Sequence, residues 1–365
     1  SKYSEMKKLL IPSLLLAALP AVAAINVSMP ANPTAVLSVT ETPIGVDSIV
    51  AQTSLTLVGG KGAYVTQSLE PARIIISQDN APIATVYSAS PKDELTVIIP
   101  AEGAATYGGS ELMDGINTLS MAAAPIEAEA MGLQALAATD PAAAQAQYER
   151  LVEKYKAIFT DFIAANPGSP AVTYAMLNLD APQFMEVYSS LSPEARTSIL
   201  MPMVERQKAG VEKQLAAEKR IAEMQNGTFE APAFTLPDLE GKQVSLSDFR
   251  GKWVVLDFWG AWCRWCIKGF PELKSAYSDY AGKIEVIGID NRDTPERWRE
   301  AVAKYALPWV NLYNDTEQPA GTALLESYAV QGFPTKVVID PQGIIRNITV
   351  GEDPDFFSKL KELVK

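Results

Sequence analysis

Two cysteines, Cys263 and Cys266, are the residues of this chain whose type and spacing could do chemistry. They are the only cysteines among 365 residues, and they form the motif C-R-W-C. The apolar run Trp253–Trp259 before them has the length and composition of a buried β-strand. The stretch after them can be helical up to Pro271. Two thiols in this arrangement can interconvert between a dithiol and a disulfide.

The start of a helix is a favourable place for such a pair. Unpaired N–H groups and a partial positive charge at a helix N-terminus stabilise a thiolate, which is the nucleophile in disulfide exchange. We therefore predict that Cys263, at the open end of the helix, attacks. We predict that Cys266, one turn further in, is more buried and resolves the mixed disulfide. Arg264 adds a cation that favours the thiolate.

Three other uses of the cysteine pair compete with redox chemistry. A zinc site needs about four ligands, and the chain offers no further cysteine and no histidine. Haem attachment needs a histidine after the second cysteine, where this chain has Ile267. A purely structural disulfide stays open, although so small a loop constrains the unfolded chain little. Redox chemistry is the favoured interpretation, with no metal and no cofactor.

Three further features lie at spacings that make the site resemble the thioredoxin superfamily. Asp257 precedes the first cysteine by six residues, Pro271 follows the second by five, and Gly332-Phe333-Pro334-Thr335 lies downstream. In that superfamily these positions hold a buried acid, a helix-kinking proline and a loop with a cis-proline. The resemblance implies that the peptide bond before Pro334 is cis and that the backbone of Phe333 pairs with an extended substrate.

The segment leading into the site, residues 234–252, narrows the resemblance. It is similar to exported thiol–disulfide oxidoreductases of the TlpA/ResA type, in particular to multidomain versions with an added N-terminal region. The resemblance covers residues 228–365 well and is weaker upstream. Gly269 stands where single-domain members often carry Glu, so a contribution of that Glu to the cysteine pKa is absent. The dipeptide Arg264-Trp265 replaces Gly-Pro, so the redox potential cannot be transferred.

The site residues follow from the chemistry and from this resemblance together. Asp257 lies inside an apolar strand, so we expect desolvation to raise its pKa and to suit it for proton exchange with Cys266. A structural acid with a partner is the alternative. The catalytic residues that we assign are Cys263, Cys266, Asp257 and Pro334. The residues that we assign to substrate binding are Trp262, Arg264, Trp265, Phe333 and Thr335.

Composition excludes several other classes of protein. Hydrophobic residues make up 48% of the chain, which argues against wholesale disorder. The net charge of −12 argues against binding to nucleic acid. The absence of histidine removes Ser-His and Cys-His catalysis.

The first residues are typical of a secretory signal peptide. Lys7 and Lys8 precede the apolar run Leu9–Leu19, and Ala21-Val22-Ala23 is a small-residue cleavage site. We therefore predict export to the periplasm and solubility after cleavage, with a retained membrane anchor as the alternative. Export would place the thiols where exchange between proteins is routine.

Changes in amino-acid composition along the chain predict four regions. They are an N-terminal extension and signal peptide (1–24), a β-rich module (25–108), a helical spacer (109–226) and a thioredoxin-like domain (227–365). In the module, strand-like runs at 54–58, 73–77, 83–87 and 95–99 suggest a small antiparallel sandwich or sheet, and residues 59–62 read as a turn. In the spacer we predict helices over 141–165, 169–177, 181–190 and 193–226.

The last region predicts an α/β fold. A hairpin over 234–246 and a helical turn over 245–250 come first. We then predict strands at 253–259, 284–290, 309–312, 336–340 and 344–350, and helices at 262–280, 295–305, 322–328 and 355–364. Strands alternating with helices imply a mixed sheet with helices on its faces, as in a thioredoxin fold.

The predicted activity is thiol–disulfide exchange on protein disulfides outside the cytoplasm, with the protein as reductant. The alternatives are a disulfide isomerase or oxidase of the same fold, a thioredoxin-fold peroxidase, and a client-binding, chaperone-like protein whose thiols are secondary. The expected partners are protein substrates with thiols or disulfides and a membrane thiol electron donor, and a homodimer stays open. No flavin or nicotinamide fingerprint is present.

Overall fold

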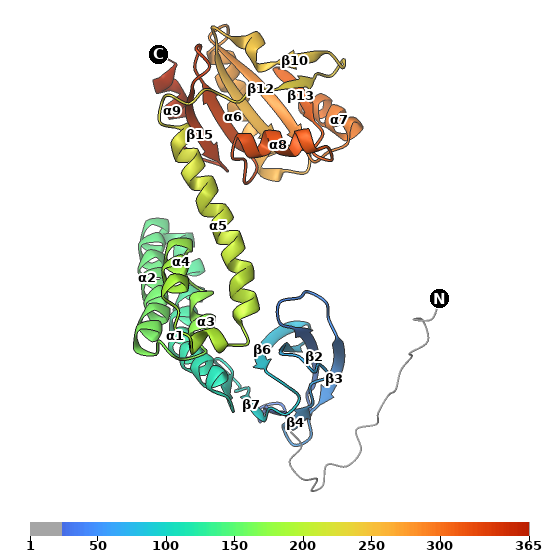
Figure 1. Ribbon diagram of the computed structural model, residues 1–365, viewed down its shortest axis with the longest axis vertical. Helices are drawn as coiled ribbons and strands as arrows, with labels where there is room; N and C mark the ends of the chain where they lie inside the picture. Colours follow the sequence, from blue (N-terminus) through green and yellow to red (C-terminus); the bar gives the residue numbers. More distant parts are fainter. Residues whose placement is uncertain (1–23, 365) are drawn as a thin grey trace, which may run out of the picture. The chain divides into compact units, whose positions relative to one another are not determined.

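The computed structural model describes residues 24–364 and is drawn in Figure 1. The predicted signal peptide therefore lies outside the described residues, apart from Ala24. By their packing, the described residues form two compact units that divide between Val211 and Glu212. The four-part division predicted from the sequence stays a prediction.

The first unit begins with eight strands in two four-stranded sheets. One sheet has the order β4-β1-β7-β8 and the other the order β3-β2-β5-β6. The strands are β1 (Ile25–Ser28), β2 (Val36–Pro43), β3 (Ala51–Thr56), β4 (Lys61–Tyr64), β5 (Ala72–Gln78), β6 (Ala81–Ser88), β7 (Leu95–Ile98) and β8 (Thr106–Gly108). Buried residues alternate along β2 and β5, so apolar side chains such as Leu37 and Ile74 form one core between the strands.

Two expectations for these strands were wrong. The predicted antiparallel arrangement fails for β1, which pairs parallel with β7 while pairing antiparallel with β4. Parallel neighbours are not joined by a hairpin, so the local turn signals could not reveal this pair. The residues predicted as a turn also divide, because Lys61 and Gly62 already belong to β4.

Helices follow the strands in the first unit. They are α1 (Glu111–Thr139), α2 (Pro141–Ala165), α3 (Val172–Met176), α4 (Ala181–Ser190) and α5 (Met201–Met224), which runs across the division between the units. The bounds predicted for α2 and α4 are confirmed. Asp140 caps α2 by accepting a hydrogen bond from the backbone N–H of Ala143 at 3.0 Å.

Two of the predicted helices were too long. The one predicted over 169–177 shrinks to the single turn of α3. The one predicted over 193–226 is broken, because residues Ala195–Thr197 form a separate 3-10 turn before α5 begins. No helix within residues 24–364 is both long and apolar enough to cross a membrane.

The second unit is built on a five-stranded mixed sheet with the order β13-β12-β11-β14-β15. The strands are β11 (Trp253–Trp259), β12 (Ile284–Asn291), β13 (Val310–Asn314), β14 (Thr335–Ile339) and β15 (Ile345–Val350). The helices are α6 (Arg264–Asp279), α7 (Pro295–Tyr305), α8 (Pro319–Ser327) and α9 (Phe356–Leu363). A small hairpin of β9 (Thr235–Pro237) and β10 (Gln243–Ser245) and a 3-10 turn (Leu246–Phe249) precede the sheet. The predicted order of elements and the thioredoxin-like fold are confirmed.

Alternation along β11 divides the core of this unit between the two faces of the sheet. Val254, Leu256 and Phe258 pack with residues of α8 and of the hairpin segment. Val255 and Trp259 face α6, α7 and α9. Residue 257 therefore points to the face that α6 covers. The alternation of side chains along β11 therefore places the carboxyl of Asp257 under α6, the helix that begins at the cysteines.

We predict that Asp340→Asn destabilises the second unit by about 2 kcal/mol, since bonds to charged groups contribute about 1.5–3 kcal/mol. Asp340 is 3% exposed, and its Oδ1 accepts bonds from the backbone N–H groups of Gln342 and Ile344 in the β14–β15 turn. Its Oδ2 pairs with the Arg346 guanidinium at 2.7 Å. Asparagine preserves the turn bonds but turns an amide donor toward the guanidinium. Urea unfolding measures the change.

Asp238→Asn is the matched control for this substitution. Asp238 also accepts two backbone N–H bonds in a hairpin turn, from Glu240 and Lys242, but it has no arginine partner among the described residues. Its substitution should cost less than about 0.5 kcal/mol. Equal losses in the two variants would contradict the role given to Arg346.

Candidate active site

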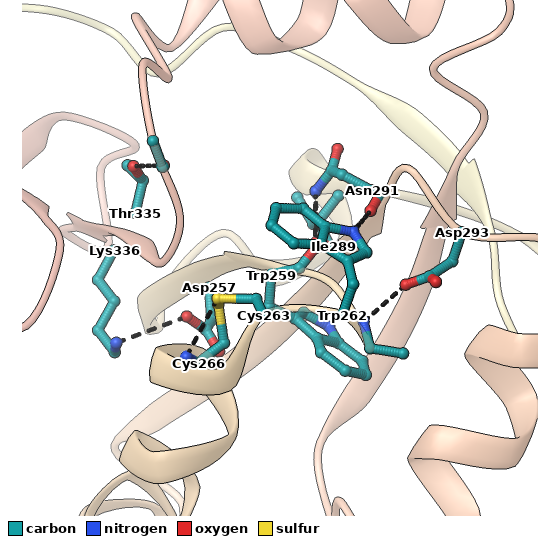
Figure 2. The surroundings of a disulfide bond; sticks show 12 residues. Asp257, Trp259, Trp262, Cys263, Cys266, Ile289, Asn291, Asp293, Thr335 and Lys336 are labelled. Atoms are coloured by element: carbon teal, nitrogen blue, oxygen red, sulfur yellow. Dashed lines mark hydrogen bonds and ion pairs between the residues drawn. A yellow bond between two sulfur atoms is a disulfide. The ribbon is translucent and has the colours of Figure 1, made fainter. Parts of the chain in front are cut away.

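The two cysteines lie where the sequence predicted them, between the end of β11 and the start of α6. They form a disulfide with a Cα–Cα distance of 5.3 Å. Cys263 is the N-cap residue of α6, and Cys266 lies in its first turn. Both are buried, with exposed fractions of 4% and 2%, so the predicted difference in their exposure is small. Figure 2 shows the pair and its surroundings.

The first sulfur is positioned to carry negative charge. The Sγ of Cys263 accepts a hydrogen bond from the backbone N–H of Cys266 at 3.1 Å. That N–H is one of the groups that a helix start leaves without a partner inside the helix. When the disulfide is reduced, this bond and the helix dipole favour a thiolate at Cys263 over a thiol. The arrangement therefore suits Cys263 for nucleophilic attack.

Asp257 lies under the cysteines on the same face of the sheet. It is 2% exposed and stands directly opposite Lys336 in the antiparallel pairing of β11 and β14. The Nζ of Lys336 lies 3.7 Å from Oδ1 of Asp257. Figure 2 marks this ion pair with a dashed line. Burial raises the pKa of Asp257, the charge of Lys336 lowers it, and the charge of Glu352 raises it. The acid is thus both desolvated, as predicted, and partnered, as the alternative held.

A second carboxylate reaches this region from the loop after β15. The Oε1 of Glu352 lies 3.1 Å from the place that a Cβ on Gly269 would occupy. Gly269 is one turn after Cys266 on α6 and faces the core. The sequence indicated that no acid stands at position 269. The structure brings a carboxylate beside that position from a distant part of the chain.

The turn after β12 holds the loop that leads into the cysteines. The carbonyl of Asn291 accepts the indole N–H of Trp262 at 3.0 Å, and its side-chain amide donates to the carbonyl of Trp259 at 3.3 Å. Asp293 accepts the backbone N–H of Ala261 at 2.6 Å. A Cβ on Gly260 would overlap the Trp262 ring and lie 2.8 Å from the Asn291 carbonyl, so glycine is required there.

Aromatic side chains flank the disulfide. Trp262 and Trp265 are 38% and 58% exposed, whereas Trp259 is fully buried. The rings of Trp262 and Phe333 meet edge to face with centroids 5.3 Å apart. Trp262 directly precedes the first cysteine and Phe333 directly precedes Pro334. The two loops beside the sulfur atoms therefore meet through these two rings.

The remaining predicted residues differ in what they expose. The Phe333–Pro334 peptide bond is cis, as the resemblance implied. Thr335 is buried and donates its hydroxyl to the carbonyl of Gly332 at 2.7 Å, so its side chain shapes this loop and faces inward. Arg264 is exposed on the first turn of α6. The substrate-binding roles of all five assigned residues stay predictions: Trp262, Arg264, Trp265, Phe333 and Thr335.

A buried acid that the sequence did not single out lies next to the loop. Asp290 lies near the end of β12 opposite Trp259 and is fully buried beside the carboxyl of Asp293. Burial raises its pKa to about 9, the neighbouring carboxyl adds to this rise, and the Arg297 guanidinium opposes it. Asp293 pairs with the Nε of Arg297 at 3.1 Å. At neutral pH Asp290 is therefore protonated and can donate its proton to Asp293.

Sequence reasoning missed several residues that complete the site. The pattern of β14 could have identified Lys336, because a lysine inside an otherwise apolar strand needs a charged or polar partner. The residues of the β12–α7 turn could have been found from their place at the carboxyl end of a strand beside β11, where loops of a parallel pair meet. Glu352 gives no such signal, since only the fold brings the loop after β15 to α6.

We predict that Asp290→Asn changes how stability depends on pH. A carboxyl whose pKa rises on folding stabilises the folded state at pH values below about 3.9, its usual unfolded value. That contribution is lost as the pH rises through about 9. Asparagine is neutral throughout, so the variant should lose less stability than the parent between these limits. Urea unfolding at pH 5, 7 and 9 checks this, with Asp279→Asn on the exposed end of α6 as control. Parallel curves for parent and D290N would contradict the assignment.

Comparison with known proteins identifies the family to which a chain with this site belongs. Residues 229–348 match the model of the AhpC/TSA family. The chain is 36% identical over 124 residues to a thiol-disulfide oxidoreductase ResA of Bacillus cereus, and the match covers 34% of this chain and 69% of that protein. It is 31% identical over 128 residues to the thioredoxin-like protein YneN of Bacillus subtilis, and this match covers 33% of this chain and 70% of that one.

A solved structure is also similar. The thioredoxin domain of a thiol-disulfide oxidoreductase from Bacteroides vulgatus is 32% identical, with a TM-score of 0.35, and the match covers 38% of this chain and 98% of that one. The family rests on the sequence relatives, because the B. cereus protein is matched at 36% identity over more than two thirds of its length. Together with the family model, this similarity shows that the chain belongs to the thioredoxin-like thiol–disulfide oxidoreductases of the ResA type.

Proposed function

We propose that this protein reduces disulfides of other proteins outside the cytoplasm and that the Cys263–Cys266 pair is its redox centre. The observation that carries the redox centre is the position of Cys263 at the N-terminus of α6, with its sulfur bonded to a helix N–H. A thiolate is stabilised there without any metal or second protein. The buried acid Asp257 on the same face of the sheet favours the reducing direction. The identity to relatives named thiol-disulfide oxidoreductases supports the same reaction.

The reaction begins with both cysteines reduced. The thiolate of Cys263 attacks one sulfur of the substrate disulfide, the substrate S–S bond breaks, and the released substrate thiolate takes up a proton. The product is a mixed disulfide between Cys263 and the substrate. The exposed rings of Trp262 and Trp265 lie beside the attacking residue and provide apolar surface for the substrate chain.

Resolution uses the second cysteine and the buried acid. The Cys266 thiol passes its proton to the carboxylate of Asp257, and the resulting thiolate attacks the Cys263 sulfur. The mixed disulfide breaks, the second substrate thiolate leaves, and the internal disulfide closes. Two electrons have then moved from the protein to the substrate. A raised pKa suits Asp257 to accept this proton near neutral pH.

The oxidised protein must be reduced again before another cycle. The sequence contains no flavin or nicotinamide fingerprint, so we propose that an external dithiol carrier in the membrane supplies the electrons. The alternative is the opposite direction, in which the pair inserts or isomerises disulfides. Arg264 and the helix start favour that direction because a stabilised thiolate makes the reduced state more stable.

The proposed location rests on the sequence before the described residues. Lys7 and Lys8, the apolar run Leu9–Leu19 and the small residues 21–23 are typical of an exported chain. Disulfide exchange between proteins is routine in that compartment. Fractionation of cells that produce the full chain, with an antibody against the second unit, tests the location directly.

The reduction potential of the pair separates the two directions. We expect a value near about −270 mV, as in thioredoxin, when the protein is equilibrated with dithiothreitol or glutathione buffers. A value near about −120 mV would make disulfide insertion or isomerisation the working role.

Cys263→Ser should abolish turnover of a protein disulfide altogether. Survival of client binding and of the cellular phenotype in C263S would instead favour the chaperone-like alternative.

The role of Asp257 has its own test. We predict that Asp257→Asn slows resolution of the mixed disulfide by about 10²–10⁴-fold at pH 7, the usual contribution of a general base. The first attack by Cys263 should be slowed far less. Stopped-flow tryptophan fluorescence can follow the two steps separately. Lys336→Met is the companion variant, because removing the cation should raise the pKa of Asp257 and move the pH profile of resolution upward. Equal slowing of both steps in D257N would show that the acid is structural.

A further inference from the structure

Three side chains from three separate loops meet on the rim of the disulfide. The guanidinium of Arg292 lies 5.1 Å from the centre of the Phe333 ring and 6.0 Å from the centre of the Trp262 ring. The two rings are themselves in edge-to-face contact. Trp262 adjoins Cys263 and Phe333 adjoins the cis-proline, so these side chains join the loop before the cysteines to the cis-proline loop. We call Arg292, Trp262 and Phe333 the Arg292 cluster.

The backbone at Arg292 is in a conformation that side chains rarely adopt. Its φ is +62°, in the left-handed region that favours glycine, and it follows directly after the last residue of β12. Its neighbours Asn291 and Asp293 are fixed by hydrogen bonds to the loop before the cysteines. These bonds hold the turn in place and direct the exposed Arg292 side chain over the two rings. Strained residues of this kind concentrate at functional sites.

The hydrogen-bond donors of Arg292 are available to a ligand. Within residues 24–364 no carboxylate pairs with it, whereas the nearby Arg297 is engaged by Asp293. Stacking over a ring uses the face of a guanidinium and leaves the N–H groups on its edge free. The indole N–H of Trp262 is already donated to the Asn291 carbonyl. Arg292 is therefore the donor that this cluster presents to solvent.

Three exposed cations lie near the disulfide, although the net charge of the chain is negative. The chain carries −12, yet exposed Arg264 and Lys268 stand on the first turns of α6, with the Lys268 ammonium 4.9 Å from the centre of the Trp265 ring. Together with Arg292 they place three cations around the cysteines. Of the acids beside the site, Asp257 and Asp293 have buried side chains and pair with Lys336 and Arg297. Glu352 is exposed and lies next to Gly269, one turn after the second cysteine.

We propose that Arg292 is a specificity-determining residue that binds a carboxylate next to the reacting cysteine of a protein substrate. This inference rests on the proposed function and names its substrate class, which is extended segments with Asp or Glu flanking the cysteine. A carboxylate accepts two parallel N–H bonds from the edge of a guanidinium, while the rings below contact the apolar part of the segment. The surrounding cations speed the encounter with acidic segments.

The test compares two peptides that form the same disulfide and differ only in Glu or Gln beside the cysteine. Peptide reduction by the full, reduced protein is followed at low ionic strength, and the ratio of kcat/KM for the Glu peptide to that for the Gln peptide is measured. We expect a ratio of about ten for the parent, as a charge-assisted bond would give. Arg292→Gln should bring the ratio to about one. Arg292→Lys keeps the charge without the fork and should give an intermediate ratio.

Arg299→Gln is the charge-matched control. Arg299 lies on α7 with its guanidinium 5.5 Å from the centre of the Trp298 ring, so the change removes the same charge and the same type of stacking away from the cluster. Its Glu-to-Gln ratio should equal that of the parent. A parental ratio near one would overturn the proposal, and so would equal effects of R299Q and R292Q.

Failure of the proposed function and failure of this inference give different results. If the proposed function is wrong, the parent reduces neither peptide and C263S changes nothing. If only the present inference is wrong, the parent reduces both peptides, C263S abolishes both reactions, and R292Q leaves the ratio where it was. Circular dichroism of R292Q and R292K shows whether each variant is folded before its ratio is interpreted.

Discussion

The redox site depends on hydrogen bonds between the end of β12 and the loop after β11. Parallel pairing of these strands places Trp259 opposite Asp290 and brings both strand ends to one edge of the sheet. From there Asn291 and Asp293 bind the Trp262 indole and the Ala261 N–H. The loop between strand and helix is short, so fixing it also fixes the sulfur of Cys263 at the helix start. A nucleophile positioned in this way does not have to be ordered at each turnover.

The charges under the site oppose one another. Burying Asp257 is unfavourable, and the cross-strand Lys336 offsets part of that cost. Glu352 acts in the other direction and keeps the acid protonated to higher pH. Three groups from β11, β14 and the loop after β15 therefore set one proton affinity. The groups that set the pKa of Asp257 are therefore spread over the sheet and lie outside the C-x-x-C motif.

The sequence predicted the elements whose signals are local or periodic. The strand over 253–259 and the helices over 141–165, 181–190 and 295–305 have the predicted bounds, because their caps and apolar spacing lie within the segments themselves. The sequence also placed Cys263 at the start of a helix, but it began that helix at residue 262, whereas α6 begins at Arg264 with Cys263 as its N-cap. The parallel pair β1–β7, the approach of Glu352 to Gly269 and the stacking of Arg292 on Phe333 join residues distant in sequence. No pattern within a segment reports such contacts.

The absence of histidine has a consequence for how the charge around the disulfide depends on pH. Histidine is the side chain that normally titrates between pH 5 and 8, and it does so by losing a positive charge. Here the groups with raised pKa near the disulfide are the carboxyls of Asp257 and Asp290, which gain a negative charge instead. Rising pH therefore makes the surroundings of the sulfur atoms more repulsive to a thiolate. The same rise deprotonates thiols, so the two effects of rising pH on a thiolate here act in opposite directions.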